Sequence, residues 1–239
     1  MAPRGKFITF EGLDGCGKTT QLERLAAALR ARGIEVLTTR EPGGTPIGER
    51  VRGVLLDSRT QGMAPLAELC LMFGSRAQHI AEVIQPALTQ GRWVLCDRFT
   101  DSSEAYQGGG RELGSEVVLA MHRLVCGNFQ PDLTVLMDND VAVSVARARR
   151  RNLAAKESAS ATPDENRFEQ ENRKFFTRVH DAFLQIAKRE PSRMIVIDAR
   201  RPPDAVHAEI VRLVCERLRV SLDAVQPDRH SHHGNRSGK

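Results

Sequence analysis

A lysine and a threonine follow a run of glycines near the start of the chain, in the order Gly12-x-x-x-x-Gly17-Lys18-Thr19. Glycines at this spacing let successive backbone N–H groups turn inward around anionic oxygens. Lys18 would reach the outer phosphates of a nucleotide, and the Thr19 hydroxyl would take one Mg²⁺ position. An ordinary glycine turn is the competing interpretation, which the flanking strand and helix patterns disfavour. The residues predicted to bind ATP phosphates are Gly12, Leu13, Asp14, Gly15, Cys16, Gly17, Lys18, Thr19 and Thr20.

An acid and an arginine stand together where a second apolar run ends. The run Trp93–Cys96 leads directly into Asp97 and Arg98. An acid at the carboxyl end of a buried strand can hold Mg²⁺ through water, and the planar guanidinium of Arg98 suits a phosphoryl group. A solvated Asp-Arg turn is the alternative, and the phosphate-binding loop upstream favours the functional interpretation.

The only tyrosine of the chain, Tyr106, precedes three consecutive glycines, Gly108–Gly110, which lie between Gln107 and Arg111. Such a glycine run predicts a backbone that approaches a ligand closely. A flexible loop is the alternative on these residues alone.

These residues need a scaffold that brings a loop and the ends of strands together. Apolar runs and 3.6-residue periodicity alternate along the chain, which predicts an α/β fold with a mainly parallel sheet covered on both faces. The predicted strands are Phe7–Phe10, Ile34–Thr39, Trp93–Cys96, Asp132–Asp138 and Met194–Ile197. The predicted helices are 22–29, 66–84, 115–125, one from Val141, 167–188 and 205–218.

The chain is predicted to form a single domain over residues 1–222. A basic cluster, Arg147–Arg151, precedes a polar stretch at 152–165 that predicts a mobile loop or a marginal helix closing over a site. We therefore place a lid at about 147–167. Residues 223–239 lack an apolar period and are predicted to be a disordered tail.

The composition disfavours membrane proteins, zinc- or disulfide-stabilised proteins and nucleic-acid-binding proteins. A chain of 239 residues with 41% hydrophobic and 27% charged residues suits one globular domain, and its net charge of +5 fits small polyphosphates. The five cysteines are scattered, odd in number and without a C-x-x-C pair, which disfavours zinc and disulfides and favours the cytoplasm. We expect no membrane span and no nucleic-acid partner, since one Trp and one Tyr offer little stacking surface.

Several motifs, in order along the chain, resemble those of the thymidylate kinases, a family of P-loop nucleoside monophosphate kinases. The resemblance runs from about Lys6 to Arg219. It implies a five-stranded parallel sheet with helices on both faces, a homodimer, and transfer of the γ-phosphoryl group of MgATP to dTMP, giving dTDP and ADP on the way to dTTP. The motifs are Glu11–Thr20, Arg40–Gly44, Arg76–His79, Asp97–Phe99, Ala105–Arg111 and, more weakly, Asn166–Glu169.

The resemblance also implies roles for single residues. Thr19 and Asp97, the latter through water, would hold Mg²⁺, while Asp14 would organise the metal and acceptor region. Arg40 and Arg98 would hold the acceptor phosphate. The residues implied to bind dTMP are Arg40, Met72, Phe73, Arg76, Arg98, Ser103, Tyr106 and Gln107. Among them Arg76 would bond a thymine carbonyl, Ser103 and Gln107 would line the base pocket, and Tyr106 would pack against the sugar and disfavour a 2′-hydroxyl.

One branch of this family has an arginine in the phosphate loop, and the other has a small residue there and arginines in the lid. Gly15 stands at that position, so the chain resembles the bacterial, lid-arginine type. The residues implied to neutralise charge during transfer, besides Lys18, Asp14 and Arg98, are Arg149, Arg151 and Arg167.

The chain departs from the family pattern at a few positions. Met72 stands where the thymine-stacking aromatic is usual, with Phe73 beside it, so either side chain could cover the base. Ser75 and Asn166 replace acids, and the lid is longer than usual. These departures concern substrate placement and lid geometry.

Two other classes of function share some of these features. A deoxynucleoside or other nucleotide kinase shares the loop, but Arg40, Arg76 and Arg98 favour an anionic acceptor. A nucleotide switch or nucleic-acid-dependent ATPase lacks support, because no Asn-Lys-x-Asp guanine signature and no extended basic, aromatic groove occurs in the sequence.

Overall fold

The structure is a computed structural model, and it describes residues 4–60, 62–157 and 166–220. The predicted tail (223–239) and the lid residues 158–165 lie outside these ranges. Among the described residues, no helix combines the length and apolarity that crossing a bilayer requires.

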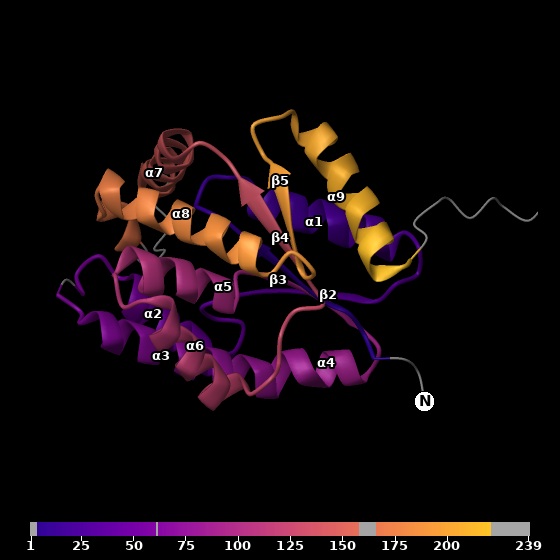
Figure 1. The fold of residues 1–239 in the computed structure, drawn as a ribbon, viewed down its shortest axis with the longest axis horizontal. Helices are drawn as coiled ribbons and strands as arrows, with labels where there is room; N and C mark the ends of the chain where they lie inside the picture. The colour runs from indigo at the N-terminus through magenta and orange to yellow at the C-terminus, as the bar shows by residue number, and fades with distance from the viewer. Residues whose placement is uncertain (1–3, 61, 158–165, 221–239) are drawn as a thin grey trace, which may run out of the picture.

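A parallel sheet forms the centre of the described part of the chain (Figure 1). Its strand order is β2-β3-β1-β4-β5, so β1 lies in the middle, paired with β3 and β4. This confirms the predicted α/β fold with five parallel strands. The strands are β1 Phe7–Glu11, β2 Val36–Arg40, β3 Trp93–Asp97, β4 Leu133–Asp138 and β5 Met194–Asp198.

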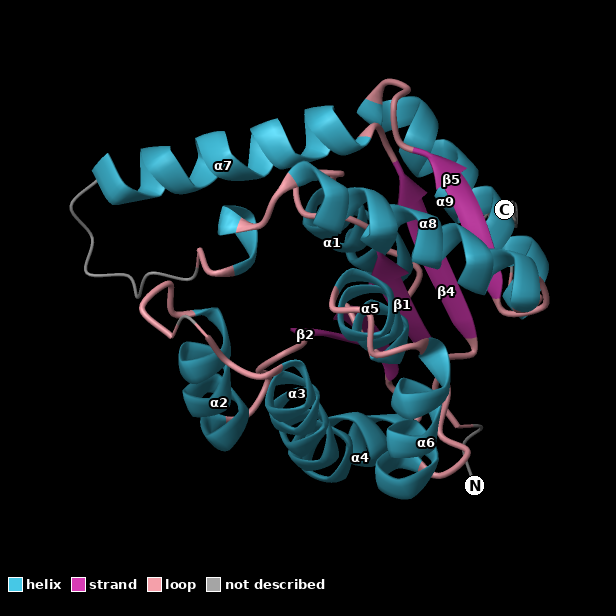
Figure 2. Ribbon diagram, turned by 60° about the vertical axis from the view of Figure 1, so that its left-hand side comes forward, coloured by secondary structure: helices cyan, strands magenta, loops and turns pink. Residues whose placement is uncertain are grey.

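Helices connect successive strands and cover the sheet on both faces (Figure 2). Two of them, η1 (Ile80–Ile84) and η2 (Glu104–Gly110), are of the wider π form and directly continue the α-helices before them. The helices before β4 are α1 Lys18–Arg30, α2 Pro46–Leu56, α3 Pro65–His79, η1 Ile80–Ile84, α4 Gln85–Thr89, α5 Thr100–Ser103, η2 Glu104–Gly110 and α6 Ser115–Cys126. The later ones are α7 Val141–Glu157, η3 Phe168–Gln170, α8 Arg173–Arg189 and α9 Pro203–Leu218.

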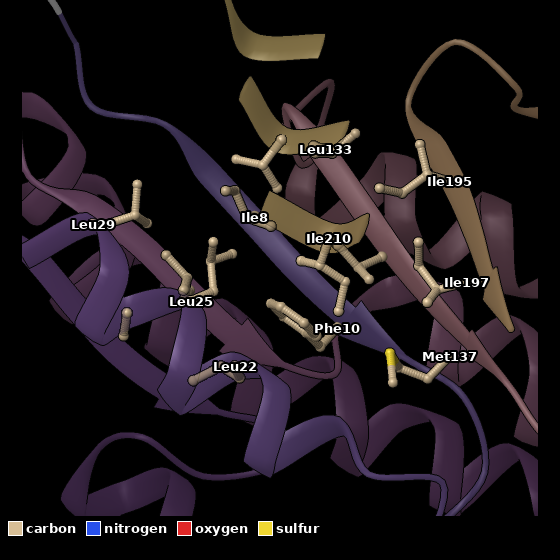
Figure 3. Close-up of a cluster of buried hydrophobic side chains, with 14 of the residues drawn as sticks. Ile8, Phe10, Leu22, Leu25, Leu29, Leu133, Met137, Ile195, Ile197 and Ile210 are labelled. Atoms are coloured by element: carbon tan, nitrogen blue, oxygen red, sulfur yellow. The ribbon is translucent and has the colours of Figure 1, made fainter. Parts of the chain in front are cut away.

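Alternation along β1 assigns its side chains to two cores. Ile8 and Phe10 point to one face, where they pack with Leu25 of α1 and Ile210 of α9 (Figure 3). Phe7 belongs to a cluster on the opposite face, with side chains of η1 and α4. Thr9 and Glu11 share the alternation of Phe7, and both are fully buried.

The parallel arrangement brings the carboxyl ends of the strands to one edge of the sheet. A polar residue ends each strand: Glu11, Arg40, Asp97, Asp138 and Asp198. Ligands of open α/β sheets bind at this edge. The fold therefore gathers residues distant in sequence where the motifs predict chemistry.

The predicted helix over 167–188 is wrong at its beginning. Arg167 and Phe168 belong to a separate turn, and α8 begins at Arg173, where the Asn172 side chain accepts a hydrogen bond from Phe175 N–H and caps the helix. Of the two alternatives for 152–165, a mobile loop or a marginal helix, the structure has helix over residues 152–157, because α7 continues to Glu157. Helix α2 was not predicted from the sequence.

The three consecutive glycines form part of a helix, η2, and the prediction that they face a ligand is not what the structure shows. A Cβ at Gly109 would lie 2.7 Å from Cβ of Ala182, and one at Gly110 would lie 2.6 Å from the Phe175 ring. Both neighbours belong to α8. The absence of side chains therefore lets two helices approach closely.

Candidate active site

The glycine loop joins β1 to α1 and bends at three left-handed positions. Gly12, Gly15 and Gly17 have φ of 129°, 83° and 100°, which other residues rarely adopt. Lys18 begins α1 and arches back over the loop, so that its buried ammonium donates to the Gly12 and Leu13 carbonyls at 3.1 and 3.0 Å. The loop thus has the strand–loop–helix context that phosphate binding requires.

Thr19 and Asp97 meet across the edge of the sheet. The Thr19 hydroxyl donates to Asp97 Oδ2 at 2.9 Å. The other oxygen, Oδ1, is buried and has no hydrogen-bond partner among the described residues. A hydroxyl beside an unsatisfied carboxylate oxygen is a donor set that suits a hard divalent cation or its bound water. The two residues could therefore hold Mg²⁺.

Arg98 and Asp14 form an ion pair that joins the residue after β3 to the loop. Arg98 Nη2 lies 2.7 Å from Asp14 Oδ1 and 3.3 Å from the Tyr106 hydroxyl, which it also donates to. Its Nη1 donates to the Ser102 hydroxyl at 2.8 Å, and its guanidinium lies 5.0 Å from the centre of the Tyr106 ring. The planar cation is held on several sides before any substrate arrives.

Asp14 sits among positive charges. Burial alone would raise the pKa of this carboxyl, but Arg98 and Lys18, with a smaller contribution from Arg151, outweigh burial and lower it. Asp14 is therefore a carboxylate throughout the neutral range. The site gathers both signs of charge, which suits a polyphosphate and the cations that accompany it.

Arg76 is almost fully buried beneath the Arg40–Gly44 loop. Its Nε donates to Glu41 at 2.8 Å, and its Nη2 donates to the Ser103 hydroxyl at 3.0 Å. Nη1 is buried without a partner among the described residues. The guanidinium stacks 4.5 Å from the centre of the Phe73 ring. An unsatisfied, fixed N–H group of this kind suits a ligand oxygen.

The two candidates for covering the base point in different directions. Phe73 is 1% exposed and packs with Leu69 and Val118, behind Arg76. Met72 is only partly buried and packs against the cluster that contains Tyr106. Met72 and Phe73 therefore pack against different clusters, on different sides of α3.

Gln107 is buried and donates to Glu68 Oε1 at 2.7 Å. The same carboxylate, on α3, is fully buried and binds Arg111 at 3.2 Å and Arg167 at 2.7 Å. Arg167 also donates to the Leu55 carbonyl. The structure thus places Arg167 in an ion pair beside Gln107, apart from the contacts of Arg98 with Asp14.

The remaining arginines differ in what they face. Arg40, 55% exposed, pairs with Glu49 of α2 at 2.9 Å. Arg149 donates to the backbone carbonyls of Glu169 and Glu171, both at 3.1 Å, and so ties α7 to the turn around η3. Arg151 is largely exposed, with Nη2 4.0 Å from Glu169 Oε1, and its charge contributes to lowering the pKa of Asp14.

Helix α7 lies directly against the phosphate loop. A Cβ at Gly15 would lie 2.2 Å from the Ser144 carbonyl oxygen and 3.0 Å from the Ala148 nitrogen. Glycine is therefore required there by the neighbouring helix as well as by its backbone angle. This contact places the middle of α7, where the predicted lid begins, against the loop.

Sequence reasoning missed the buried carboxylates that hold these arginines. Glu41 binds Arg76 and His79, Glu68 binds Arg111 and Arg167, and Glu11 accepts from the segment after Arg98. For Glu11 a signal existed, since an acid that directly continues the apolar run from Phe7 to Phe10 is expected to be buried. The other two gave no comparable signal.

Comparisons with known proteins agree with this geometry. A family model described as thymidylate kinase matches residues 10–210. The chain is 47% identical over 216 residues to a thymidylate kinase of Trichlorobacter lovleyi, covering 90% of the chain and 100% of the relative. It is 48% identical over 217 residues to one of Pseudomonas fluorescens, covering 91% and 98%. The crystal structure of thymidylate kinase from Ehrlichia chaffeensis matches with a TM-score of 0.68 and 34% identity, over 89% of this chain and 99% of that one.

Proposed function

Since the chain belongs to the thymidylate kinase family, it phosphorylates dTMP with ATP to give dTDP for dTTP synthesis, and we propose how its residues divide that work. An oxygen of the dTMP phosphate bonds to the γ-phosphorus of ATP, while the bond from that phosphorus to the β-phosphate oxygen breaks and ADP leaves. Such a reaction asks for positioning and charge neutralisation more than for covalent chemistry.

One observation supports these roles above all: the phosphate loop and the start of α1 contact the residues at the end of β3, through Thr19 with Asp97 and Asp14 with Arg98. Lys18 and the loop amides hold the donor phosphates. Thr19 and Asp97 would hold Mg²⁺, Asp97 through water. This fit rests on the buried Oδ1 of Asp97, which has no hydrogen-bond partner among the described residues. When bound, the metal neutralises charge on the donor phosphates. Asp14 keeps Arg98 at this point for the acceptor phosphate.

The acceptor nucleotide lies over α3 and η2. Arg76 donates to a thymine carbonyl from Nη1, which has no partner in the part of the chain that the structure describes, and Met72 covers the base. Ser103 supports the pocket by holding Arg76, and Tyr106 packs against the sugar. Arg40 is half exposed and pairs with Glu49 in this structure. When dTMP binds, Arg40 breaks this ion pair and binds the acceptor phosphate.

Among the arginines of the expected lid, we assign Arg151 to the transferring phosphoryl group. Its exposure and its effect on Asp14 support this role. Arg149 and Arg167 fasten the segments around α7 and η3, since both are engaged with carbonyl or carboxylate oxygens.

The substitution Arg98→Ala tests the assignment. Loss of a charge-assisted contact should raise KM for dTMP by about tenfold or more, with KM for ATP changed much less. Equal weakening of both substrates would indicate a structural role instead. A side-by-side assay with dTMP, dUMP, dCMP and thymidine tests the substrate itself, and rapid turnover of thymidine but not dTMP would overturn the assignment.

We further propose that two copies pair through α2, α3 and α6. Large apolar side chains are exposed on these neighbouring helices, namely Ile47 (54%), Val54 (48%), Leu66 (52%), Val117 (41%) and Leu124 (81%). Burying such a patch favours association. Sedimentation should show a dimer that Leu66→Asp dissociates and that Leu153→Asp, an exposed leucine on α7, leaves intact. A wild-type monomer would exclude the pairing.

The cytoplasmic location expected from the scattered cysteines also stays a proposal, which cell fractionation would test.

A further inference from the structure

Glu11 is a fully buried acid that takes no part in the roles assigned above. It ends β1 and directly precedes the phosphate loop. Alternation along β1 turns its side chain to the face where the segment after β3 lies. A carboxyl in such a place is costly unless hydrogen bonds satisfy it.

Both oxygens of the Glu11 carboxyl group bond to the segment that follows Arg98. The backbone N–H of Phe99 donates to Oε1 at 2.7 Å, and the Ser102 hydroxyl donates to Oε2 at 2.5 Å. The Ser102 hydroxyl in turn accepts from Arg98 Nη1 at 2.8 Å. One side chain therefore restrains the backbone next to Arg98 and, through a single hydroxyl, the guanidinium itself.

Arg98 needs such restraint because its backbone has φ of 72°, in the left-handed region that residues with side chains rarely adopt. Its own N–H donates to the Phe10 carbonyl at 3.0 Å. Phe10 and Glu11 thus hold the two successive amides at this turn. The end of β1 fixes the geometry of the turn after β3.

The electrostatic surroundings fit a positioning role. Burial is the main cause that raises the pKa of Glu11 to about 8, with Asp101 adding to it, while Ser102, Arg98 and the Phe99 amide oppose the shift. The neutral Cys96 thiol and the Arg193 guanidinium also sense Glu11. Since both oxygens are bonded to protein groups, Glu11 has no oxygen to offer a substrate.

We propose that Glu11 is a positioning residue for phosphoryl transfer, which acts by fixing Arg98 at the acceptor phosphate through Phe99 and Ser102. The inference rests on the proposed role of Arg98. Glu11 lies at the end of β1, the strand that leads into the loop for the ATP phosphates, yet it acts on the arginine that binds the dTMP phosphate. The two substrate sites are therefore coupled through Glu11.

Kinetics of three variants test this inference. Ser102→Ala breaks the link to Arg98 and should raise KM for dTMP by about tenfold, with KM for ATP within about twofold. Glu11→Ala removes both contacts and should raise it further. Glu11→Gln keeps an acceptor for Phe99 N–H but puts an amide N–H where the Ser102 hydroxyl donates, so Ser102 would have to turn and accept from it. KM for dTMP should therefore rise less than in Glu11→Ala.

Thr9→Val is the matched control. Thr9 is fully buried on the same strand, two residues before Glu11, and bonds the Thr134 hydroxyl at 2.9 Å. Its loss should lower the melting temperature and leave KM for dTMP unchanged. If Thr9→Val raised KM for dTMP as much as Ser102→Ala does, the effect of Ser102→Ala would reflect a general loss of stability. That result would overturn the inference.

A double-mutant cycle separates failure of this inference from failure of the proposed function. In an Arg98→Ala background, Ser102→Ala should add no further rise in KM for dTMP, because its effect passes through Arg98. Additive effects would show that Ser102 and Glu11 act independently of Arg98. If Arg98→Ala alone leaves KM for dTMP unchanged, the acceptor role of Arg98 fails first. If Arg98→Ala raises KM for dTMP while folded Ser102→Ala and Glu11→Ala proteins both match wild type, only the positioning role fails.

Discussion

Arg98 Nη2 lies 2.7 Å from Asp14 Oδ1, so the guanidinium assigned to the acceptor phosphate is paired with a carboxylate of the donor loop. The pair spans two strand ends, since Asp14 follows β1 and Arg98 follows β3. An incoming phosphate meets a cation whose orientation is already set. Preorganised charge of this kind stabilises a transition state without rearrangement during the reaction.

Lys18→Ala should lower kcat by two to three orders of magnitude, because its ammonium is the fixed cation over the loop. Since the same ammonium bonds two loop carbonyls, circular dichroism and a melting curve must show that the variant is folded. A folded variant that retains kcat within about threefold would exclude the role of Lys18.

Met72→Ala and Phe73→Ala should separate binding from stability. Phe73 is enclosed in the core behind Arg76, so its truncation should cost about 3–5 kcal/mol in the free energy of unfolding. Met72→Ala should raise KM for dTMP severalfold with a smaller loss of stability. Urea unfolding and steady-state kinetics measure the two quantities. A larger kinetic effect from Phe73→Leu, which keeps much of the volume, would assign the base to Phe73 instead.

Arg151→Ala and Arg149→Ala form a matched pair on α7. Arg151→Ala should lower kcat by about tenfold or more and leave the melting temperature unchanged, because the side chain is exposed and its charge reaches the loop. Arg149→Ala loses two hydrogen bonds to backbone carbonyls and should chiefly lower the melting temperature. If instead Arg149→Ala lowered kcat and Arg151→Ala lowered the melting temperature, Arg149 would be the residue that acts on the transferred phosphoryl group.

Glu11→Gln should change how stability depends on pH. The pKa of Glu11 is raised, mainly by burial, from 4.5 to about 8 in the folded protein. Between these values the folded state keeps a proton that the unfolded state has lost, so stability falls as pH rises, by at most about 1.4 kcal/mol per pH unit from this group. Glutamine has no proton to lose. The free energy of unfolding of Glu11→Gln, relative to wild type, should therefore increase from pH 5 to pH 8; a constant difference would refute the raised pKa.

The sequence predicts the parts of the fold and site that depend on local pattern. Apolar runs identified all five strands of the sheet, and the glycine spacing identified the loop, because these signals lie within a few residues. Asp97 and Arg98 were placed correctly at a strand end. Their distance from Thr19 and Asp14 follows from parallel pairing of β1 with β3, which the alternation of elements implies.

The parts that could not be predicted depend on partners distant in sequence. Arg167 lies 99 positions from Glu68, and nothing near either residue announces their ion pair. The glycines at 108–110 carry the same local signal whether a ligand or a helix approaches them, and here α8 does so. The position of a helix start such as Arg173 was obscured because apolar periodicity continues from Phe168 across the break.

The close approach of Ser144 and Ala148 to Gly15 makes the phosphate loop and α7 sterically dependent on each other. With α7 seated on the loop as it is here, no side chain fits at position 15. A larger residue there would have to push α7 away from the loop, and every side chain on that helix would move with it. A viable substitution at position 15 would therefore require compensating changes in α7.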